Sequence, residues 1–323
     1  MKLSIVLASL LALVVAAAAR ADAPLLVAQP AAPMERTNGW FDYLVVDQQL
    51  NRLLLAHAGN DELAIVDLNS GDVIKRIDTG SSRGVAVDSE DGKYFVGTVD
   101  NTVVVVDSRS MLLKDKIALP GPVDAIAFDP KNHTLFADED GGNVVWAIDG
   151  RTEKVKAAIS IPADPEYVVY DPVTDRVYQN IVSTSSVVVI NPETNAIVAT
   201  WPLAPAARPH GLAVDSTRHR LYSAGANGKL AVLDTRSGAL VASVDIAPRV
   251  DQIDLDPGTA RVYCASGTGL LSVAQGTDAG ATALGNVVVP RGTHTLAVDP
   301  KTHAVWIAYG GQQTDFLMKL TPP

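Results

Sequence analysis

Short apolar stretches that end in an acidic residue recur along the whole chain. Seven times a mostly apolar triplet runs directly into an aspartate, and these aspartates are Asp47, Asp88, Asp129, Asp171, Asp215, Asp256 and Asp299. Successive aspartates are 41, 41, 42, 44, 41 and 43 residues apart. Consecutive apolar positions, without alternation, are the pattern of a strand that is buried on both faces. We therefore expect seven copies of one structural unit.

Each copy contains three more strand patterns after its aspartate. In the fifth copy, a turn leads into residues 220–224, a polar turn leads into residues 230–234, and a last strand follows Ser237-Gly238. Four short strands in about 40 residues are typical of a propeller blade. The sequence thus predicts an all-β fold, a seven-bladed β-propeller with four antiparallel strands per blade. The unbroken repeat also predicts one domain over residues 22–323.

The last copy lacks its fourth strand. Only Thr321, Pro322 and Pro323 follow its third strand pattern, which are too few for another strand. Residues 25–29 are the one unassigned strand-like stretch, and pairing them with the last blade would close the ring and cover exposed strand edges. In the sixth copy, the residues from 276 to 285 are rich in Gly, Ala and Thr and predict a flexible loop at the blade edge.

The first 21 residues have the features of an export signal. Lys2 supplies a positive charge, residues 5–19 are apolar, and Ala19-Arg20-Ala21 is a small-x-small cleavage pattern. The apolar stretch is too short to span a membrane. We therefore expect cleavage after Ala21 and a mature protein, periplasmic or secreted, that has no transmembrane segment and is a monomer.

Composition narrows the range of partners. Loss of Lys2 and Arg20 lowers the 26 basic residues to 24 against 36 acidic ones, so the formal net charge moves from −10 to −12. Nucleic acid and anionic lipid surfaces attract basic patches, so neither is expected as a partner. Cys264 is the single cysteine, which excludes an intrachain disulfide, and its strand pattern predicts a buried, unreactive thiol.

The repeat resembles that of a known family. Residues 208–215 (Arg-Pro-His-Gly-Leu-Ala-Val-Asp), residues 220–224 (Arg-Leu-Tyr-Ser-Ala) and residues 227–238 resemble the YVTN repeat of YncE-like periplasmic seven-bladed propellers. The resemblance covers the whole mature chain. It implies the fold and a periplasmic location but no single activity, because related propellers include binding proteins, lactonases and lyases. No Trp-Asp pair ends the third strands, so a WD40 repeat is not supported.

A set of ionisable residues becomes visible when positions are counted back from each repeated aspartate. Five residues before it, the seven copies carry Asp42, Arg83, Asp124, Glu166, His210, Asp251 and His294. The innermost strands of a propeller surround its axis, so these residues are expected to form a ring at one mouth of the channel, here named the mouth ring. A solvated channel would tolerate such residues without chemistry. Under this interpretation the propeller binds a small ligand or a partner protein on its channel face and is not a catalyst.

The order of the mouth ring also permits a metal site. His210, Asp251 and His294 belong to consecutive copies, and ring closure would place Asp42 beside His294. Two imidazoles and neighbouring carboxylates are the ligand set of an open divalent transition-metal site. The alternative function is therefore a divalent-metal-dependent enzyme of the lactonase or lyase type. A divalent metal ion is the one cofactor that the sequence suggests.

Several residues have defined roles in this alternative. Asp124 and Glu166 lie on adjacent blades and would share a proton as acid and base, or bind Ca²⁺ or Mg²⁺ through oxygen ligands. Arg83 would hold a substrate carboxylate or phosphate, or would simply balance the surrounding acids. Asp254 interrupts an apolar innermost strand and would either orient a ligating imidazole or be a buried, hydrogen-bonded acid.

A second tier of candidates lies in the turn after the second strand, which opens on the same face. Its members occupy matched places and are His57, Thr98, Glu139 and Tyr309. His57 and Tyr309 are on adjacent blades, where either would be a proton donor, and Glu139 and Tyr309 are candidate ligand contacts. The other interpretation is that these are simply exposed loop residues. A further set of histidines recurs in the first turn on the opposite face, where we expect surface turn residues: His133, His219 and His303.

Overall fold

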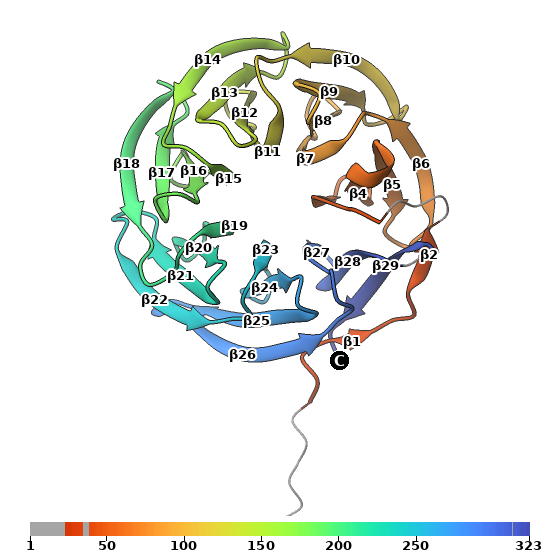
Figure 1. Ribbon diagram of the computed structural model, residues 1–323, viewed down its shortest axis with the longest axis vertical. Coiled ribbons are helices and arrows are strands. Elements are labelled where there is room, and N and C mark those ends of the chain that lie inside the picture. The colour runs from red at the N-terminus through yellow and green to blue at the C-terminus, as the bar shows by residue number, and fades with distance from the viewer. Residues whose placement is uncertain (1–22, 35–38, 312) are drawn as a thin grey trace, which may run out of the picture.

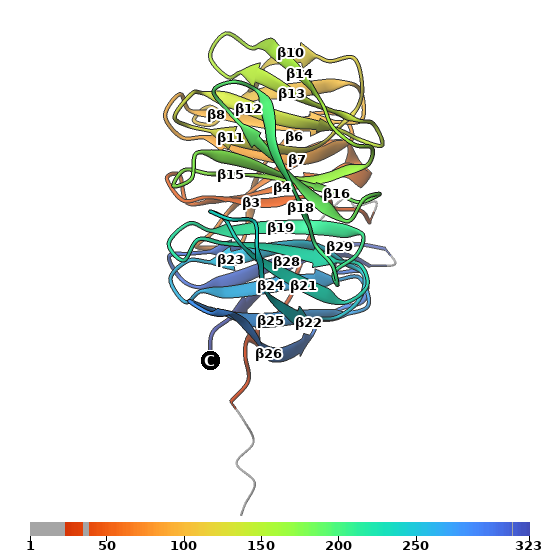
Figure 2. The same ribbon diagram turned by 90° about the vertical axis from the view of Figure 1, so that its left-hand side faces the viewer.

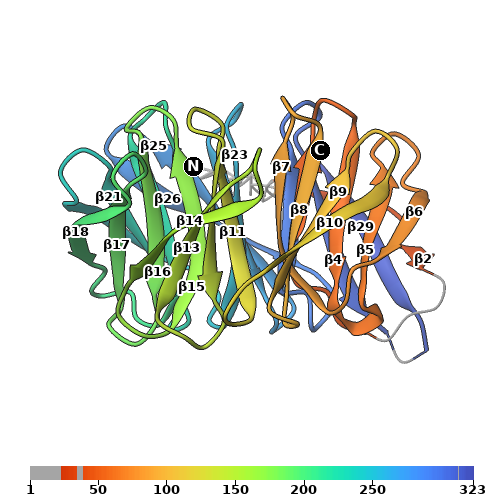
Figure 3. The same ribbon diagram turned by 90° about the horizontal axis from the view of Figure 1, so that it is seen from above.

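Seven antiparallel sheets surround a central axis in the computed structural model, as the repeat predicts (Figure 1). The structure describes residues 23–34, 39–311 and 313–323. The predicted export signal, residues 1–21, lies outside the described residues. Each apolar triplet forms the innermost strand of its blade, and the following strands pair outward in chain order. Side views show the strands of every blade running between the two faces of the disc (Figures 2 and 3).

Most strands of the first six blades are six or seven residues long. The first three blades comprise β3 (Leu44–Asp47), β4 (Arg52–His57), β5 (Glu62–Asp67), β6 (Val73–Asp78), β7 (Ser82–Asp88), β8 (Lys93–Thr98), β9 (Thr102–Asp107), β10 (Leu112–Ala118), β11 (Val123–Asp129), β12 (Thr134–Glu139), β13 (Val144–Asp149) and β14 (Lys154–Ser160). The next three comprise β15 (Pro165–Asp171), β16 (Arg176–Ile181), β17 (Ser186–Asn191), β18 (Ala196–Pro202), β19 (Pro209–Asp215), β20 (Arg220–Gly225), β21 (Lys229–Asp234), β22 (Leu240–Asp245), β23 (Val250–Asp256), β24 (Arg261–Ser266), β25 (Leu270–Thr277) and β26 (Gly280–Val288). A short 3-10 helix, η1 (Ala58–Asn60), joins β4 to β5.

The repeated aspartate has a structural role in the turn after each innermost strand. In the second blade, Asp88 Oδ1 accepts hydrogen bonds from the backbone N–H groups of Glu90 and Asp91, both at 3.1 Å. This is an Asx turn, in which the side chain replaces a backbone acceptor. Four residues after each aspartate, the backbone is left-handed, with φ between 48° and 67°, at Asn51, Gly92, His133, Asp175, His219, Ala260 and His303. The three turn histidines therefore occupy equivalent positions in the turns of their blades.

The N-terminal segment closes the ring. Blade seven consists of β27 (Thr295–Asp299), β28 (Ala304–Gly310) and β29 (Asp315–Thr321), and its outer position is filled by β1 (Val27–Ala28) and β2 (Ala32–Met34), which both pair with β29 (Figure 1). The predicted closing strand, residues 25–29, is thus confirmed around β1, whereas β2 was not predicted. Pro30 separates the two short strands and Pro33 lies within β2. Proline has no N–H to donate to a ladder, so the sequence there does not read as a strand.

The prediction of a flexible loop in the sixth blade is wrong. Residues 276–285 belong to the hairpin of β25 and β26, with Asp278 and Ala279 between the paired residues Thr277 and Gly280. A Cβ on Gly276 would lie only 2.5 Å from the Tyr222 hydroxyl oxygen of the preceding blade. The small residues therefore permit close packing between blades, and their abundance does not indicate flexibility.

The hydrophobic core lies between the blades. Its largest fully buried side chains include one tyrosine of the second strand in each of four blades, Tyr94, Tyr178, Tyr222 and Tyr263. The predicted buried thiol is confirmed, because Cys264 is fully buried and its pKa is raised by burial. Within the described ranges, no helix has the length and apolar character needed to cross a membrane.

Candidate functional site at the channel mouth

Two tyrosines meet across the central axis. The Tyr43 hydroxyl, from the first blade, donates a hydrogen bond to the backbone oxygen of Glu166 in the fourth blade at 3.3 Å. The Tyr43 ring lies 5.0 Å from the ring of Tyr167, whose hydroxyl accepts a hydrogen bond from Gln252 of the sixth blade at 3.1 Å. Because blades one, four and six lie on different sides of the ring, these contacts span the axis. They form the floor of the channel mouth.

Two adjoining pockets lie at this mouth. The first, here named the acidic pocket, has a volume of about 170 Å³ and is lined by every residue of the mouth ring except His210. The second, here named the basic pocket, has a volume of about 440 Å³ and is lined by His210 together with Arg208 and Arg249. The pockets share Trp40, Asp251 and His294. The seven residues grouped by sequence position therefore come together in space.

Arg83 is paired with acids inside the acidic pocket. Its Nη1 lies 2.9 Å from Asp42 Oδ2, its Nη2 lies 3.7 Å from Asp140 Oδ2, and its guanidinium stacks 4.3 Å from the centre of the Trp40 ring. Burial raises the pKa of Asp42 to about 6, although the hydrogen bond and charge of Arg83 oppose the shift. In this arrangement Arg83 balances charge.

Asp124 is the acid of the pocket that lacks a partner. No described residue donates a hydrogen bond to it, and its pKa is raised well above the ordinary value by burial and then by the neighbouring carboxyl groups of Asp42 and Asp138. Behind it, the fully buried Asp138 accepts hydrogen bonds from the backbone N–H of Ala125 at 2.6 Å and from Gln179 at 2.8 Å. A cationic ligand group beside Asp124 would supply the charge partner that the described residues do not provide.

His210 bridges two carboxylates. Its Nδ1 lies 2.8 Å from Glu166 Oε1 and 3.6 Å from Asp251 Oδ1. One potential ligand atom from each of these three residues lies within 4.8 Å of the others, so they could hold a metal ion. Hydrogen bonding to Asp251 and Glu166 raises the pKa of His210 to about 10. At neutral pH a proton therefore occupies the position that a metal would need, and Glu166 pairs with His210 and not with Asp124.

His294 does not join this cluster. Its Nδ1 lies 2.8 Å from the backbone oxygen of Gly292, and its Nε2 lies 2.7 Å from that of Phe41 in the first blade. Both ring nitrogens therefore lie against backbone oxygens and not beside Glu166, His210 and Asp251. Since Asp42 is bonded to Arg83, the predicted ligand set of His210, Asp251, His294 and Asp42 is not assembled in this arrangement.

His57 lies outside both pockets, and the expectation that it is an exposed loop residue is wrong. Its side chain is fully buried, with Nδ1 3.1 Å from Glu62 Oε1 and Nε2 3.1 Å from Asp315 Oδ2. Its ring stacks on Phe41 at 4.2 Å. Carboxylates on two neighbouring blades therefore hold it in the interior, where it links the first blade to the last.

The other residues of the second tier also line neither pocket. Glu139 accepts a hydrogen bond from the backbone N–H of Asn143 at 3.1 Å and so stabilises its own turn. Tyr309 stacks on Phe316 with 5.3 Å between ring centres, and Thr98 is fully buried. The neighbouring Asp140, which the sequence did not single out, faces the acidic pocket instead of Glu139.

Asp254 is a partly buried, hydrogen-bonded acid, and its bonds are not confined to blade six, as one of its two predicted roles required. It accepts hydrogen bonds from the backbone N–H groups of Leu255 and of Val298 in the seventh blade, both at 2.8 Å. Burial raises its pKa to about 6. No imidazole of the described residues bonds to it, and its role is to connect blades six and seven.

A second group of possible metal ligands lies on the opposite face. Asp88, Asp91 and His133 bring one ligand atom each within 4.8 Å of the others. The guanidinium of Arg151 already contacts this group, with its Nε 2.9 Å from Asp91 Oδ2. Its positive charge disfavours a metal ion at that position.

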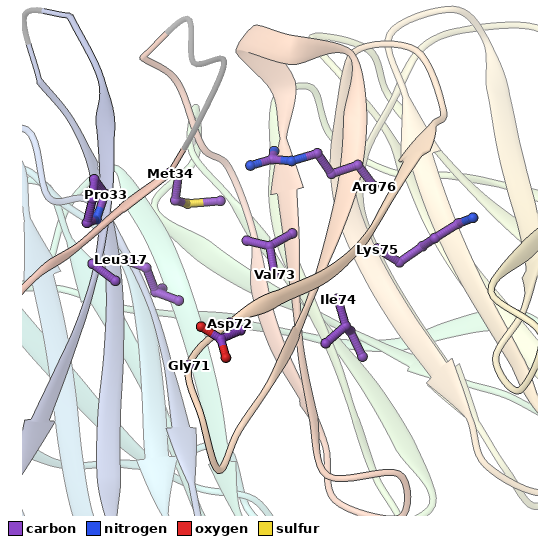
Figure 4. Close-up of a pocket in the computed structure, with 10 residues that line it drawn as sticks. Pro33, Met34, Gly71, Asp72, Val73, Ile74, Lys75, Arg76 and Leu317 are labelled. Carbon is purple, nitrogen blue, oxygen red and sulfur yellow. The ribbon is translucent and has the colours of Figure 1, made fainter.

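The pocket with the largest volume among those described lies far from the ionisable residues of the channel mouth. It has a volume of about 540 Å³ and lies at the outer rim, between β2 and β29 of the last blade and β6 of the first (Figure 4). Met34, Val73 and Leu317 supply much of its surface, with Lys75 and Arg76 at one side. The ionisable residues with shifted pKa values cluster instead at the channel mouth, so we place the candidate site there.

Other positions of the repeat supply residues that were not predicted. Seven residues before each repeated aspartate, the chain carries Trp40, Ser81, Pro122, Asp164, Arg208, Arg249 and Gly292. Four residues before it, the chain carries Tyr43, Gly84, Ala125, Tyr167, Gly211, Gln252 and Thr295. The first series places arginines on blades five and six. The second combines the long side chains of the floor with glycines at Gly84 and Gly211, where a Cβ would meet the backbone of the next blade.

The bridging role of His210 predicts a dependence of stability on pH. Its pKa is raised from 6.5 to about 10 in the folded protein, so the protonated form contributes stability that is fully present below pH 6.5 and is lost as pH rises toward 10. In urea unfolding, the wild type should lose about 1–3 kcal/mol relative to His210→Gln over this range, a figure reduced for partial exposure. His219→Gln, on the opposite face, is the control. A constant difference between wild type and His210→Gln at pH 6 and pH 9.5 would contradict this role.

Comparisons with known proteins support the fold. No family model matches the chain, and no curated protein does. Among solved structures, Kuenenia stuttgartiensis hydrazine synthase is similar with a TM-score of 0.76 and 12% sequence identity, over 88% of this chain and 96% of that one. At this identity the likeness extends to the fold alone. The chain therefore shares its β-propeller fold with proteins of quite different sequence.

Proposed function

We propose that this protein is an exported, YncE-like propeller that binds a ligand at its channel mouth and does not catalyse a reaction. The observation that carries the proposal is the pair of adjoining pockets, lined by all seven residues of the mouth ring and closed below by Tyr43 and Tyr167. A blind, polar recess of this kind suits a small ligand better than a passage through the disc. The YVTN-like repeat and the export signal in the sequence support the family and the location.

Binding is favoured over catalysis by the way the ionisable groups are engaged. Arg83 is bonded to Asp42, His210 is bonded to Glu166, and His294 contacts two backbone oxygens. A general base needs a free lone pair and a general acid needs a proton that it can release near neutral pH. These three groups instead form a fixed polar wall, which leaves Asp124 available to contact a ligand.

The metal-dependent lactonase or lyase is the second candidate. It is favoured by the proximity of Glu166, His210 and Asp251, whose ligand atoms suit a divalent ion. Under this candidate the metal would have to displace the proton of His210. Metal affinity should then fall steeply as pH decreases.

One thermal-shift experiment compares the two candidates. The mature protein is screened against small carboxylates, inorganic phosphate, amines, amino acids, Ca²⁺, Mn²⁺ and Zn²⁺. We expect an organic compound to stabilise it, by about 2.7 kcal/mol at a hundredfold excess over the Kd. Ala226→Trp should abolish this shift, because Ala226 lines the basic pocket and a large side chain there would fill it. Arg109→Gln, an exposed position that lines neither pocket, is the matched control.

Two results would decide against the proposal. Stabilisation by a divalent ion that is lost in His210→Ala, together with hydrolysis of a lactone, would favour the enzyme. Stabilisation that is equal in the wild type and in Ala226→Trp would place the ligand elsewhere on the molecule.

A further inference from the structure

The two pockets at the mouth differ in charge, and this difference specifies the ligand. Five carboxyl groups line the acidic pocket, those of Asp42, Asp124, Asp140, Glu166 and Asp251. Arg83 pairs with two of them and His210 with two others. Asp124 is left over, partly buried and without a described hydrogen-bond donor. A pocket of this size and charge would accept one small cationic group, such as a primary ammonium, which has three N–H donors.

The basic pocket has the opposite character. Arg208 and Arg249 stand at matched positions of adjacent blades, both exposed, and no carboxylate of the described residues forms an ion pair with either guanidinium. His210 and His294 line the same pocket, but the ring nitrogens of His294 already contact backbone oxygens, so the two arginines are its free donors. Guanidinium groups match the geometry of carboxylates and can bind them through two parallel hydrogen bonds. The pocket is therefore built to receive an anionic group.

Both pockets belong to one small site. They share Trp40, Asp251 and His294, so the two pockets adjoin along these side chains. The volume of the basic pocket, about 440 Å³, falls within the range of about 300–1,000 Å³ that small-molecule sites occupy. A single molecule with charges of opposite sign at its two ends would satisfy both pockets at once.

We propose that the mouth binds a zwitterionic small molecule of the amino-acid class, with its ammonium group in the acidic pocket against Asp124 and its carboxylate in the basic pocket against Arg208 and Arg249. This inference rests on the proposed function and names the chemical class of its ligand. The neutral remainder of the molecule lies between the pockets, along Trp40.

A series of ω-amino acids tests this assignment. Glycine, β-alanine, γ-aminobutyrate and 5-aminovalerate carry their charged ends at increasing separation, and binding is measured by isothermal titration calorimetry. Butyrate and butylamine each carry one charge and serve as reference compounds. We expect the best zwitterion to bind at least tenfold more tightly than either reference compound. The optimum length within the series reports the separation of the two pockets.

Variants then assign each end of the ligand. Arg208→Gln and Arg249→Gln should each weaken the zwitterion at least tenfold and leave butylamine unaffected. Asp124→Asn should weaken the zwitterion and butylamine but leave butyrate unaffected, and because it removes a partly buried acid without a described partner, it should fold normally. Arg109→Gln should change none of these affinities.

The outcomes separate this inference from the proposed function. If no zwitterion of the series binds more tightly than butyrate and butylamine, the inference is overturned. If only anions bind, in a manner that depends on Arg208 and Arg249, the ligand is not zwitterionic but the mouth is still a binding site. Binding of butyrate or of a zwitterion with unchanged affinity in Ala226→Trp, which fills the basic pocket, overturns both.

Discussion

Replacing His57 with alanine is expected to lower the free energy of unfolding by about 3–5 kcal/mol, because a large buried ring is removed and the buried carboxyl group of Asp315 loses a hydrogen-bond partner. His57 is fully buried between Glu62 and Asp315, at 3.1 Å from each. Burial opposes ionisation of Glu62, but hydrogen bonds and charges of His57 and Arg76 outweigh it and lower the pKa of that carboxyl group. Loss of the stacked contact with Phe41 adds to the effect. Urea unfolding of the variant measures it.

A double-mutant cycle separates the interaction of His57 with Asp315 from the loss of packing. His57→Ala, Asp315→Asn and the double variant are compared, and the double variant should lose at least about 1 kcal/mol less than the sum of the single losses. His219→Ala is the control for removing a histidine, with an expected loss within about 1 kcal/mol. A loss for His57→Ala as small as that of the control, or a coupling of zero, would contradict the role described.

The fold was predictable because its determinants are local and repeated. The apolar triplets, the Asx-turn aspartates and the turn residues recur in every copy, so each copy supports the interpretation of the others. The predictions failed where packing between strands or blades, and not the local sequence, determines the structure. The small residues near Gly276 resemble a loop, yet they permit contact with Tyr222, and the prolines around β2 conceal a strand that forms only against β29.

The location of the candidate site was more predictable than its chemistry. Position within the repeat brings Asp42, Arg83 and the rest of the mouth ring to one end of the axis, and the pockets are found there. Partner choice depends on side-chain directions that spacing cannot supply. His294 lies beside the first blade, as ring closure predicts, but its nitrogens face the backbone oxygens of Gly292 and Phe41.

The two arginines of the basic pocket also occupy a position that the repeat defines. Arg208 and Arg249 each lie seven residues before a repeated aspartate, so the sequence alone predicts that they lie at the same face on adjacent blades. Their meaning still depends on the structure, because exposed arginines are common and only the adjoining pockets give these two a ligand class.

Removal of the closing strands is expected to have the largest effect on the protein as a whole. Deletion of residues 23–34 would expose the edge of β29 and remove Leu26 and Met34, which are 5% and 2% exposed. An uncovered strand edge is prone to pair with other chains. We expect the truncated protein to aggregate or to unfold at a much lower temperature than the protein that retains residues 23–34, as measured by light scattering and thermal denaturation.

Point variants distinguish closure of the ring from the mere loss of residues. Met34→Ala should cost about 2–5 kcal/mol, and Met34→Leu, which conserves volume, should cost less than about 1.5 kcal/mol. A synthetic peptide of residues 23–34 should restore the melting temperature of the truncated protein by adding a strand to β29, whereas the same peptide with Met34→Asp should not. A truncated protein that melts as the protein with residues 23–34 does would show that blade seven is stable without its outer strands. The ring would then be closed by the remaining contacts between the last and first blades, among them those of β27 with β3 and of Asp315 with His57.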